Sequence, residues 1–482
     1  MNRGRDVHPN ALLLILCTAT FMSALDLFIV NVGLRAIGAD VGEHSLADLS
    51  WVLNAYAIVF AALLVPAGRL ADRYGNKQLF QVGLVLFTIG SLGCAASSDL
   101  WFIVGLRCLQ ATGAAALVPT SLGLILTAMP PARRAHSVQL WAVSGSIGAA
   151  AGPVLGGLLV QLSWRYIFLL NVPIGVGALV AAAFLAPNVR HGTETRIPDL
   201  LGGLLLMAAV GALALALVQG PQWGWQSGPT LSAFAVAVAG LAAFGARTRT
   251  AAVPVVDFAL FRDRAFAWGS VANLVLAICF GAQLLGLVLW LQEGWGWSAL
   301  QTGLGIAPGP AMVSVSAIGL RRYTRELPAG WVAAAGALLM GGGGLLIGRS
   351  LTAQTHYAAQ VLPGWLIIGA GFGFAVPTLV GAATRGLAPS QTSTGSAIVQ
   401  MARQLGSVLG VALLVVVLGG GTANAGRLSR FVDVWWWAAG LALLAGAASI
   451  PVDRHRGDRD RTVPAAATIA AVGAEPAPVV VA

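Results

Sequence analysis

Two ionisable side chains lie deep inside apolar stretches of the chain. Asp26 occurs within residues 11–33, and Arg107 occurs within residues 101–126. An ionisable group in hydrocarbon is costly unless it is paired, solvated or protonated. At about 1.5 Å per helical residue, both groups are expected roughly 10 Å below the same membrane surface, where they would interact. Burial favours a neutral carboxyl and a guanidinium favours a carboxylate, so Asp26 could load and release a proton; the alternative is a purely structural pair.

A glycine-rich stretch, GSIGAAAGPVLGG, spans residues 145–157. Glycine weakens a helix interior by about 1 kcal/mol, so several on one face need a reason. The usual reason in lipid is close approach by a neighbouring helix, and a proline adds a bend. We interpret the stretch as a hinge face, with plain helix packing as the alternative. Its members are Gly145, Gly148, Gly152, Pro153, Gly156 and Gly157.

A short charged loop, GRLADRYGNK, follows the apolar stretch 50–68. Asp72, Arg73 and Lys77 would lie at the membrane edge, with Gly68 and Gly75 shaping the turn. Asp72 could pair with a basic residue of another span, or cap a helix N-terminus, in one conformation only. Such a contact would make the loop a conformational latch. The alternative is a basic loop that only fixes membrane topology.

Further polar residues at helical spacing are candidates for substrate binding. Residues 393–418 carry a polar stripe at intervals of three and four. The alternative is that each of these side chains only forms hydrogen bonds between helices. The single deep carboxylate favours neutral, zwitterionic or singly charged lipophiles over multiply charged cations, and Arg403 would favour an anionic group. The stripe is Ser393, Ser396, Gln400, Arg403 and Ser407, and the other candidates are Asn54, Tyr56, Gln110 and Gln283.

The elements that carry these residues are membrane helices. The chain has 482 residues, of which 57% are hydrophobic and 10% charged, and its mean hydropathy is +0.81. No soluble domain of this size has that composition. The predicted fold is an all-α membrane protein with fourteen transmembrane helices. The spans are 11–33, 50–68, 79–97, 101–126, 137–159, 166–187, 199–219, 229–246, 265–289, 299–320, 328–348, 358–382, 393–418 and 433–451.

The charge pattern predicts the topology. Most of the 28 Lys and Arg residues fall in alternate loops that would be cytoplasmic if the N-terminus is inside. Both termini are therefore expected in the cytoplasm, with the chain in the cell inner membrane. The net charge of +10 reflects this topology and contact with anionic membrane lipid. It does not indicate a nucleic-acid partner, because the basic residues are dispersed.

The pattern of spans predicts four parts. Residues 1–190 would form a six-helix bundle, 191–250 two inserted helices, 251–452 a second six-helix bundle, and 453–482 a disordered cytoplasmic tail. The four cysteines are scattered, and no metal cluster or catalytic triad is visible, so neither a metal nor a cofactor is expected. The short loops argue against an enzyme, and the short tail argues against a sensor.

Four motifs together resemble a known family. They are LDLFIVNVGL, GRLADRYGNK, RCLQATGAAALVP, and GPVLGG followed by WRYIFLLNVPIG. In order and spacing the chain resembles the fourteen-span drug:proton antiporter group of the major facilitator superfamily. It departs from that pattern at Phe28 for Thr, Arg35 for Pro, Asn76 for Arg and Ala111 for Gly.

The resemblance implies roles for three of these regions. It implies that Arg107 takes part in proton transfer and that the Asp72 loop is a latch. It also implies that the glycine–proline stretch marks an exporter. We therefore expect a monomeric antiporter that exchanges protons for a hydrophobic small molecule, such as a drug or antibiotic, by alternating access. A proton-coupled or facilitative uptake carrier on the same fold is the alternative, and a non-transporting sensor or an enzyme is a remote one.

Overall fold

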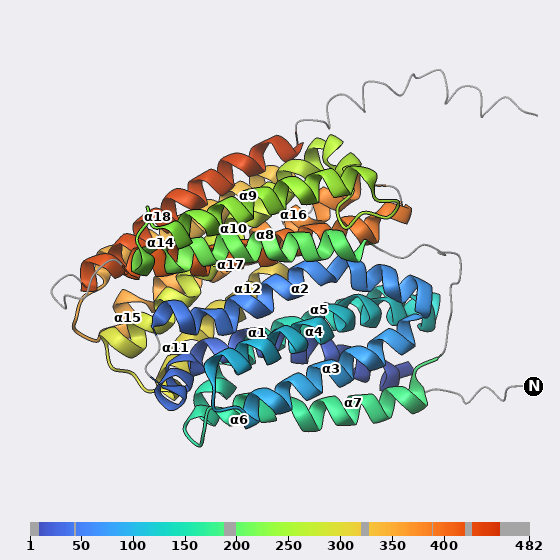
Figure 1. Ribbon diagram of the computed structural model, residues 1–482, viewed down its shortest axis with the longest axis horizontal. Helices are drawn as coiled ribbons and strands as arrows, with labels where there is room; N and C mark the ends of the chain where they lie inside the picture. The colour runs from blue at the N-terminus through green and yellow to red at the C-terminus, as the bar shows by residue number, and fades with distance from the viewer. Residues whose placement is uncertain are drawn as a thin grey trace, which may run out of the picture.

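Long helices run side by side through the whole molecule (Figure 1). The computed structural model describes residues 9–42, 45–187, 199–319, 327–387, 389–419 and 427–453, and these residues contain no β-strand. Thirteen of their helices are long and apolar enough to cross a membrane. The predicted all-α membrane fold is thereby confirmed. The predicted tail, apart from Asp453, lies outside the described residues, and the predicted domain boundaries stay a prediction.

The N-terminal part is a bundle that begins with α1 (Pro9–Val41). Two of its helices start at a side-chain cap: Ser45 accepts a hydrogen bond from the Asp48 amide, and Asp99 accepts one from the Phe102 amide. The other elements are α2 (Leu46–Tyr74), α3 (Asn76–Ala96), α4 (Leu100–Ala128), α5 (Pro131–Val160), α6 (Arg165–Leu169) and α7 (Asn171–Leu185).

The C-terminal part is a second bundle around α10 (Arg264–Leu289). A π-helical turn, η2 (Trp290–Gly294), extends α10 at one end. The remaining long elements are α14 (Ala329–Ser350), α16 (Leu362–Arg385), α17 (Pro389–Gly419) and α18 (Arg427–Ser449); the short ones are η1 (Phe258–Arg262), α15 (Tyr357–Gln360) and η4 (Ile450–Asp453).

The predicted span 299–320 is broken into two helices, α11 (Ala299–Ile306) and α12 (Pro308–Gly319). Pro310 has no N–H, so it cannot bond the Ile306 carbonyl one turn earlier. The indole of Trp365 donates to that carbonyl instead, at 2.8 Å. This crossing therefore consists of two short helices in series, which is why only thirteen helices meet the length needed for a span.

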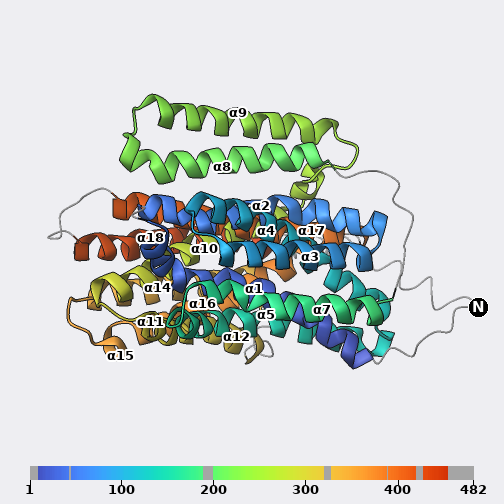
Figure 2. The same cartoon turned by 60° about the horizontal axis from the view of Figure 1, so that its bottom comes forward.

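The inserted helices α8 (Leu200–Trp223) and α9 (Gly228–Thr250) form a hairpin on one side of the bundle, with α9 outermost (Figure 2). One end is fixed by an ion pair between Arg247 and Asp199, at 3.0 Å. Apolar side chains of α8 cluster with α2 and with α17, so α8 contacts both halves. These side chains are Leu206, Val210, Ala214 and Val218.

The two halves are hydrogen-bonded where α1 and α10 end, which is the predicted external end. Arg35 Nη1 donates to the Gln292 carbonyl at 2.8 Å. The Gln292 side chain in turn donates to the Val32 carbonyl at 3.1 Å. The two bonds form a reciprocal clasp between the end of α1 and η2. Arg35 stands where the family motif has proline, so this clasp depends on one of the departures from the motif.

Candidate functional site

The structure brings Asp26 of α1 and Arg107 of α4 into contact. Arg107 Nη1 lies 2.5 Å from Asp26 Oδ2, and both side chains are completely buried. A buried pair is stable only when its remaining polar atoms also find partners. The surroundings of each group therefore decide what the pair can do.

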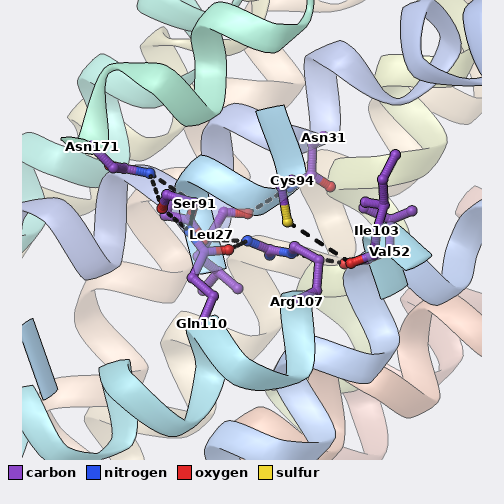
Figure 3. A network of polar contacts seen from close by, with 10 residues as sticks. Leu27, Asn31, Val52, Ser91, Cys94, Ile103, Arg107, Gln110 and Asn171 are labelled. Carbon is purple, nitrogen blue, oxygen red and sulfur yellow. Dashed lines mark hydrogen bonds and ion pairs between the residues drawn. The ribbon is translucent and has the colours of Figure 1, made fainter. Parts of the chain in front are cut away.

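The carboxylate of Asp26 is held by two amides (Figure 3). Gln110 Nε2 donates to Asp26 Oδ1 at 2.8 Å, and Asn171 Nδ2 donates to the same oxygen at 3.2 Å. Ser91 Oγ accepts from both amides, at 2.7 Å from Gln110 and 3.3 Å from Asn171. Helices α1, α3, α4 and α7 thus meet at one carboxylate, and a change in its charge is felt by all four.

The guanidinium of Arg107 is fixed on a different set of groups. Its Nε donates to the Val52 carbonyl at 3.1 Å, and its Nη1 also donates to Gln110 Oε1 at 2.6 Å. The Tyr56 ring lies 4.1 Å from the guanidinium carbon, a cation–π contact. Nη2 is buried without a hydrogen-bond partner. The cation is therefore held largely by the carboxylate and by an aromatic face.

This arrangement couples charge to structure. In the ion pair the two charges cancel. Protonating Asp26 would leave the guanidinium as an uncompensated cation. Breaking a buried pair by removing one charge costs about 3–5 kcal/mol, so the site favours rearrangement when Asp26 is neutral.

Sequence reasoning missed two members of this site, Ser91 and Asn171. Asn171 is the first residue of α7, at the junction with α6. It belongs to WRYIFLLNVPIG, a motif used above only for the resemblance. The amide inside that apolar motif was the signal that could have identified it. Ser91 carried no comparable signal, because single serines are common in membrane helices.

The glycine face of α5 packs directly on α1. A Cβ at Gly152 would lie 2.9 Å from the Phe28 Cβ, and one at Gly156 would lie 2.9 Å from the Ile29 carbonyl oxygen. At Gly148 a Cβ would overlap the Phe21 carbonyl. Side chains are therefore excluded from this face by the backbone of α1. Gly145 continues the face toward Thr20.

The neighbouring face of α5 touches the other half of the molecule. A Cβ at Gly157 would lie 2.5 Å from the Ala299 carbonyl oxygen of α11. A Cβ at Gly303 of α11 would overlap the Pro153 carbonyl. The glycine–proline stretch thus has α1 on one side and α11 on the other. It lies at a seam between the halves rather than inside one of them.

The charged loop forms a tight turn between α2 and α3. Gly75 has a φ of 100°, which favours glycine, and its N–H bonds the Ala71 carbonyl at 2.9 Å. Lys77 Nζ donates to the Ala183 carbonyl near the end of α7, at 2.9 Å. Gly68 faces Pro119 of α4, and Arg73 lies over the Tyr74 ring. The side chain of Asp72 lies outside the described residues, so the latch stays a prediction.

The predicted substrate residues fall in four places. Tyr56 and Gln110 belong to the ion-pair site described above. Gln283 of α10 is fully buried inside the C-terminal half, where its Nε2 would lie 2.9 Å from a Cβ at Gly344. Asn54 is also buried, with only a long 3.5 Å bond to Ser50. Gln400 and Arg403 are half-buried on α17, and the side chain of Ser393 lies outside the described residues.

A bundle of apolar spanning helices with a buried acid–base pair defines a multi-pass membrane transporter. Residues 16–411 match the Major Facilitator Superfamily, and the chain belongs to that family. Solved structures of the same fold include an auto-inhibited POT family peptide transporter, with a TM-score of 0.67 and 15% identity over 92% of this chain and 97% of that one. A D-xylose–proton symporter has a TM-score of 0.63 and 13% identity over 91% of this chain and 97% of that one.

Curated relatives cover most of the chain. The Methylenomycin A resistance protein of Streptomyces coelicolor is 31% identical over 452 residues, 92% of each chain. The Tetracenomycin C resistance and export protein of Streptomyces glaucescens is 32% identical over 90% of this chain and 79% of its own. The Multidrug resistance protein Stp of Mycobacterium tuberculosis is 33% identical over 83% of this chain and 74% of its own.

Proposed function

We propose that the protein exports a hydrophobic small molecule, of the drug or antibiotic class, in exchange for protons. The observation that carries the proposal is the fully buried Asp26–Arg107 pair, whose charges are balanced only when Asp26 is ionised. The relatives named as resistance and export proteins support the direction of transport. The proton gradient would supply the energy, and no cofactor is required.

The proposed cycle alternates between two charge states. With the external side open, Asp26 is ionised, paired with Arg107 and reached by protons from outside. Protonation removes the attraction and leaves Arg107 free to seek other partners. The halves would then rock about the seam between α5 and α11, which closes the clasp at the external end and opens the cytoplasmic side. Release of the proton to the cytoplasm would restore the pair, and movement of the bound substrate would return the halves to the state open outside.

The proposal also includes the oligomeric state, the membrane and the topology of the protein. It would act as a monomer in the cytoplasmic membrane, with both termini in the cytoplasm, in contact with membrane lipid. The turn between α2 and α3 would then lie at the cytoplasmic surface, where the latch role of Asp72 can be tested.

The test is proton-driven transport by reconstituted protein. Asp26→Asn keeps the shape of the side chain but cannot ionise, so we expect transport driven by a pH gradient to fall at least tenfold. Asp40→Asn is the matched control: it is on the same helix, but its carboxylate is half-exposed and pairs with Arg165 at 2.6 Å. Undiminished proton-driven transport by Asp26→Asn would contradict the coupling role.

An uptake carrier is separated from an exporter by direction. In vesicles with the protein in one orientation, reversing the pH gradient should reverse the direction of substrate movement. An antiporter moves the substrate against the proton flow, whereas a proton-coupled uptake carrier moves it with the protons. A facilitative carrier would show no dependence on the gradient.

A further inference from the structure

Arg403 is a cation deep in a membrane span, and it has no partner among the described residues. It lies on α17, within the spanning segment Thr394–Leu418. Among the described residues no hydrogen bond, ion pair or ring contact involves its guanidinium, and its Nε is buried without a partner. An unpaired charge at this depth is costly and marks a functional position.

The packing of α17 shows which way this side chain faces. Gly406 and Gly410 touch the backbone of α10, at Leu274 and Ile278. The apolar residues Ile398, Val399, Met401 and Val408 pack in one cluster with α2 and α8. At helical spacing, Gln400, Arg403 and Ser407 share a third face, on which Ser407 borders Gly281 of α10. This face lies on the side of α17 away from Ile398, Met401 and Val408, and the side chain of Arg403 on it is only partly buried.

The balance of charge on this face is positive. Deep in the spans, the ionisable groups with described side chains that carry charge are Asp26, Arg107 and Arg403. The first two neutralise each other, which leaves the charge of Arg403 without a counterion. Gln400 lies one turn before it and Ser407 one turn after, so a guanidinium, an amide and a hydroxyl can all donate to the same ligand.

We infer that Arg403, with Gln400 and Ser407, binds an anionic group of the transported molecule. A carboxylate fits best, because a planar guanidinium binds it through two parallel hydrogen bonds. The ligand class is therefore a lipophilic monoanion, with its apolar part against the partly buried apolar side chains of the halves. This inference rests on the proposed export function, since it names the cargo of that cycle.

The inference has an electrical consequence. Exchange of one monoanion leaving the cell for one entering proton moves two charges in the direction favoured by a negative interior. Export of such a ligand should therefore be faster when a potassium diffusion potential, negative inside, is imposed with valinomycin. Exchange of one neutral molecule for one proton moves a single charge and should respond less.

The direct test compares two probes that differ only in charge. We would measure fluorescence anisotropy of 1-pyrenebutyrate and of its neutral amide, 1-pyrenebutyramide, with the full-length protein in nanodiscs and empty nanodiscs as the blank. The wild type should bind the carboxylate at least tenfold more tightly. Arg403→Gln should remove this preference and leave amide binding unchanged, and Arg403→Lys should keep part of it.

The control is Arg349→Gln, which removes an exposed cation at the end of α14. It should leave the preference for the carboxylate intact. Equal affinities of the wild type for the two probes, or a preference that persists in Arg403→Gln, would overturn the inference. The test is separable from that of the proposed function: failed proton coupling shows as proton-independent transport by the wild type, whereas failed anion recognition shows only in the ratio of the two affinities.

Discussion

The two halves of the molecule treat the same position in opposite ways. In the N-terminal half, the two amides that hold Asp26 of α1 also donate to Ser91, the sixteenth residue of α3. In the C-terminal half, Gln283 of α10 faces Gly344, the sixteenth residue of α14. The carboxylate has a partner for each oxygen, whereas neither amide atom of Gln283 has a hydrogen-bond partner.

The surroundings differ in the same way. In the N-terminal half a guanidinium lies between Tyr56 and the carboxylate. In the C-terminal half the space near α10 and α16 holds aromatic rings, with Phe280 stacked on Phe372 at 4.3 Å. The N-terminal half thus carries a buried pair of opposite charges, whereas around Gln283 the C-terminal half carries neutral polar and aromatic side chains. Under the proposed function, the first half would exchange protons and the second would recognise the cargo.

The largest effect is expected from breaking the charge balance of the N-terminal half. Arg107→Gln leaves a buried carboxylate without its cation, which should lower the free energy of unfolding by about 3–5 kcal/mol. The double variant Asp26→Asn, Arg107→Gln should recover most of that loss but not proton-driven transport. Thermal unfolding in detergent and vesicle transport measure the two quantities. If the double variant is as unstable as the single one, Arg107 acts through its packing and not through its charge.

A second prediction compares the glycine contacts of the halves. Gly152 of α5 lies on α1, and Gly406 of α17 lies in the same manner on α10. If α5 is the hinge, Gly152→Leu should reduce transport more than tenfold at normal expression, and more than Gly406→Leu does. Gly177→Leu is the control, because a Cβ there meets nothing within 4 Å. Equal losses at Gly152 and Gly406 would reduce the α5 stretch to ordinary helix packing.

Substitution of Gln283 tests whether the C-terminal half needs this buried amide for stability or for transport. Both polar atoms are buried without partners, so Gln283→Leu should leave the free energy of unfolding unchanged or raise it by about 1–3 kcal/mol. Gln283→Asp should lower it instead, because no cation faces the new carboxylate. Thermal unfolding gives the order of the three proteins. Loss of transport in a stable Gln283→Leu variant would instead support the predicted role in substrate binding.

The smallest effect is expected at the clasp between the halves. Arg35→Ala removes the hydrogen bond to the Gln292 carbonyl. Because Arg35 is exposed, we expect the loss to destabilise the clasped state by about 1 kcal/mol relative to the state open at the predicted external end. That corresponds to roughly a fivefold shift toward the state open at the predicted external end. Labelling of a cysteine introduced on α11 would report the shift. Arg165→Ala, which breaks bonds within one half only, should not change labelling.

The depth of the site residues in the membrane was easier to predict from the sequence than the direction in which their side chains point. Counting residues from the ends of spans placed Asp26 and Arg107 at one level, because helical rise is constant. It could not say which side of its helix Gln283 faces, because that depends on neighbours distant in the chain. Gln283 was grouped with the substrate residues because it is a polar side chain within an apolar span; the structure places it inside the C-terminal half, and its role stays a prediction. Predicting Asn171 as a partner of Asp26 would have required knowing that α7 packs near α3.

The breaks in the helices were partly visible in the sequence. Pro308 and Pro310 both lie within the predicted span 299–320, and proline interrupts helical hydrogen bonding. The span was predicted from hydropathy, which does not register a missing N–H, so the break between α11 and α12 was not predicted. By contrast, the hinge stretch of α5 contains Pro153 and continues as one helix.

The position of α8 gives the molecule two unlike flanks toward the bilayer. On one flank, α8 and α9 stand between lipid and the line where α2 meets α17. On the opposite flank, α5 and α12 expose apolar side chains such as Ile147 and Val315 directly. Under the proposed function, a lipophilic cargo dissolved in the membrane would therefore approach the interface between the halves from this second flank.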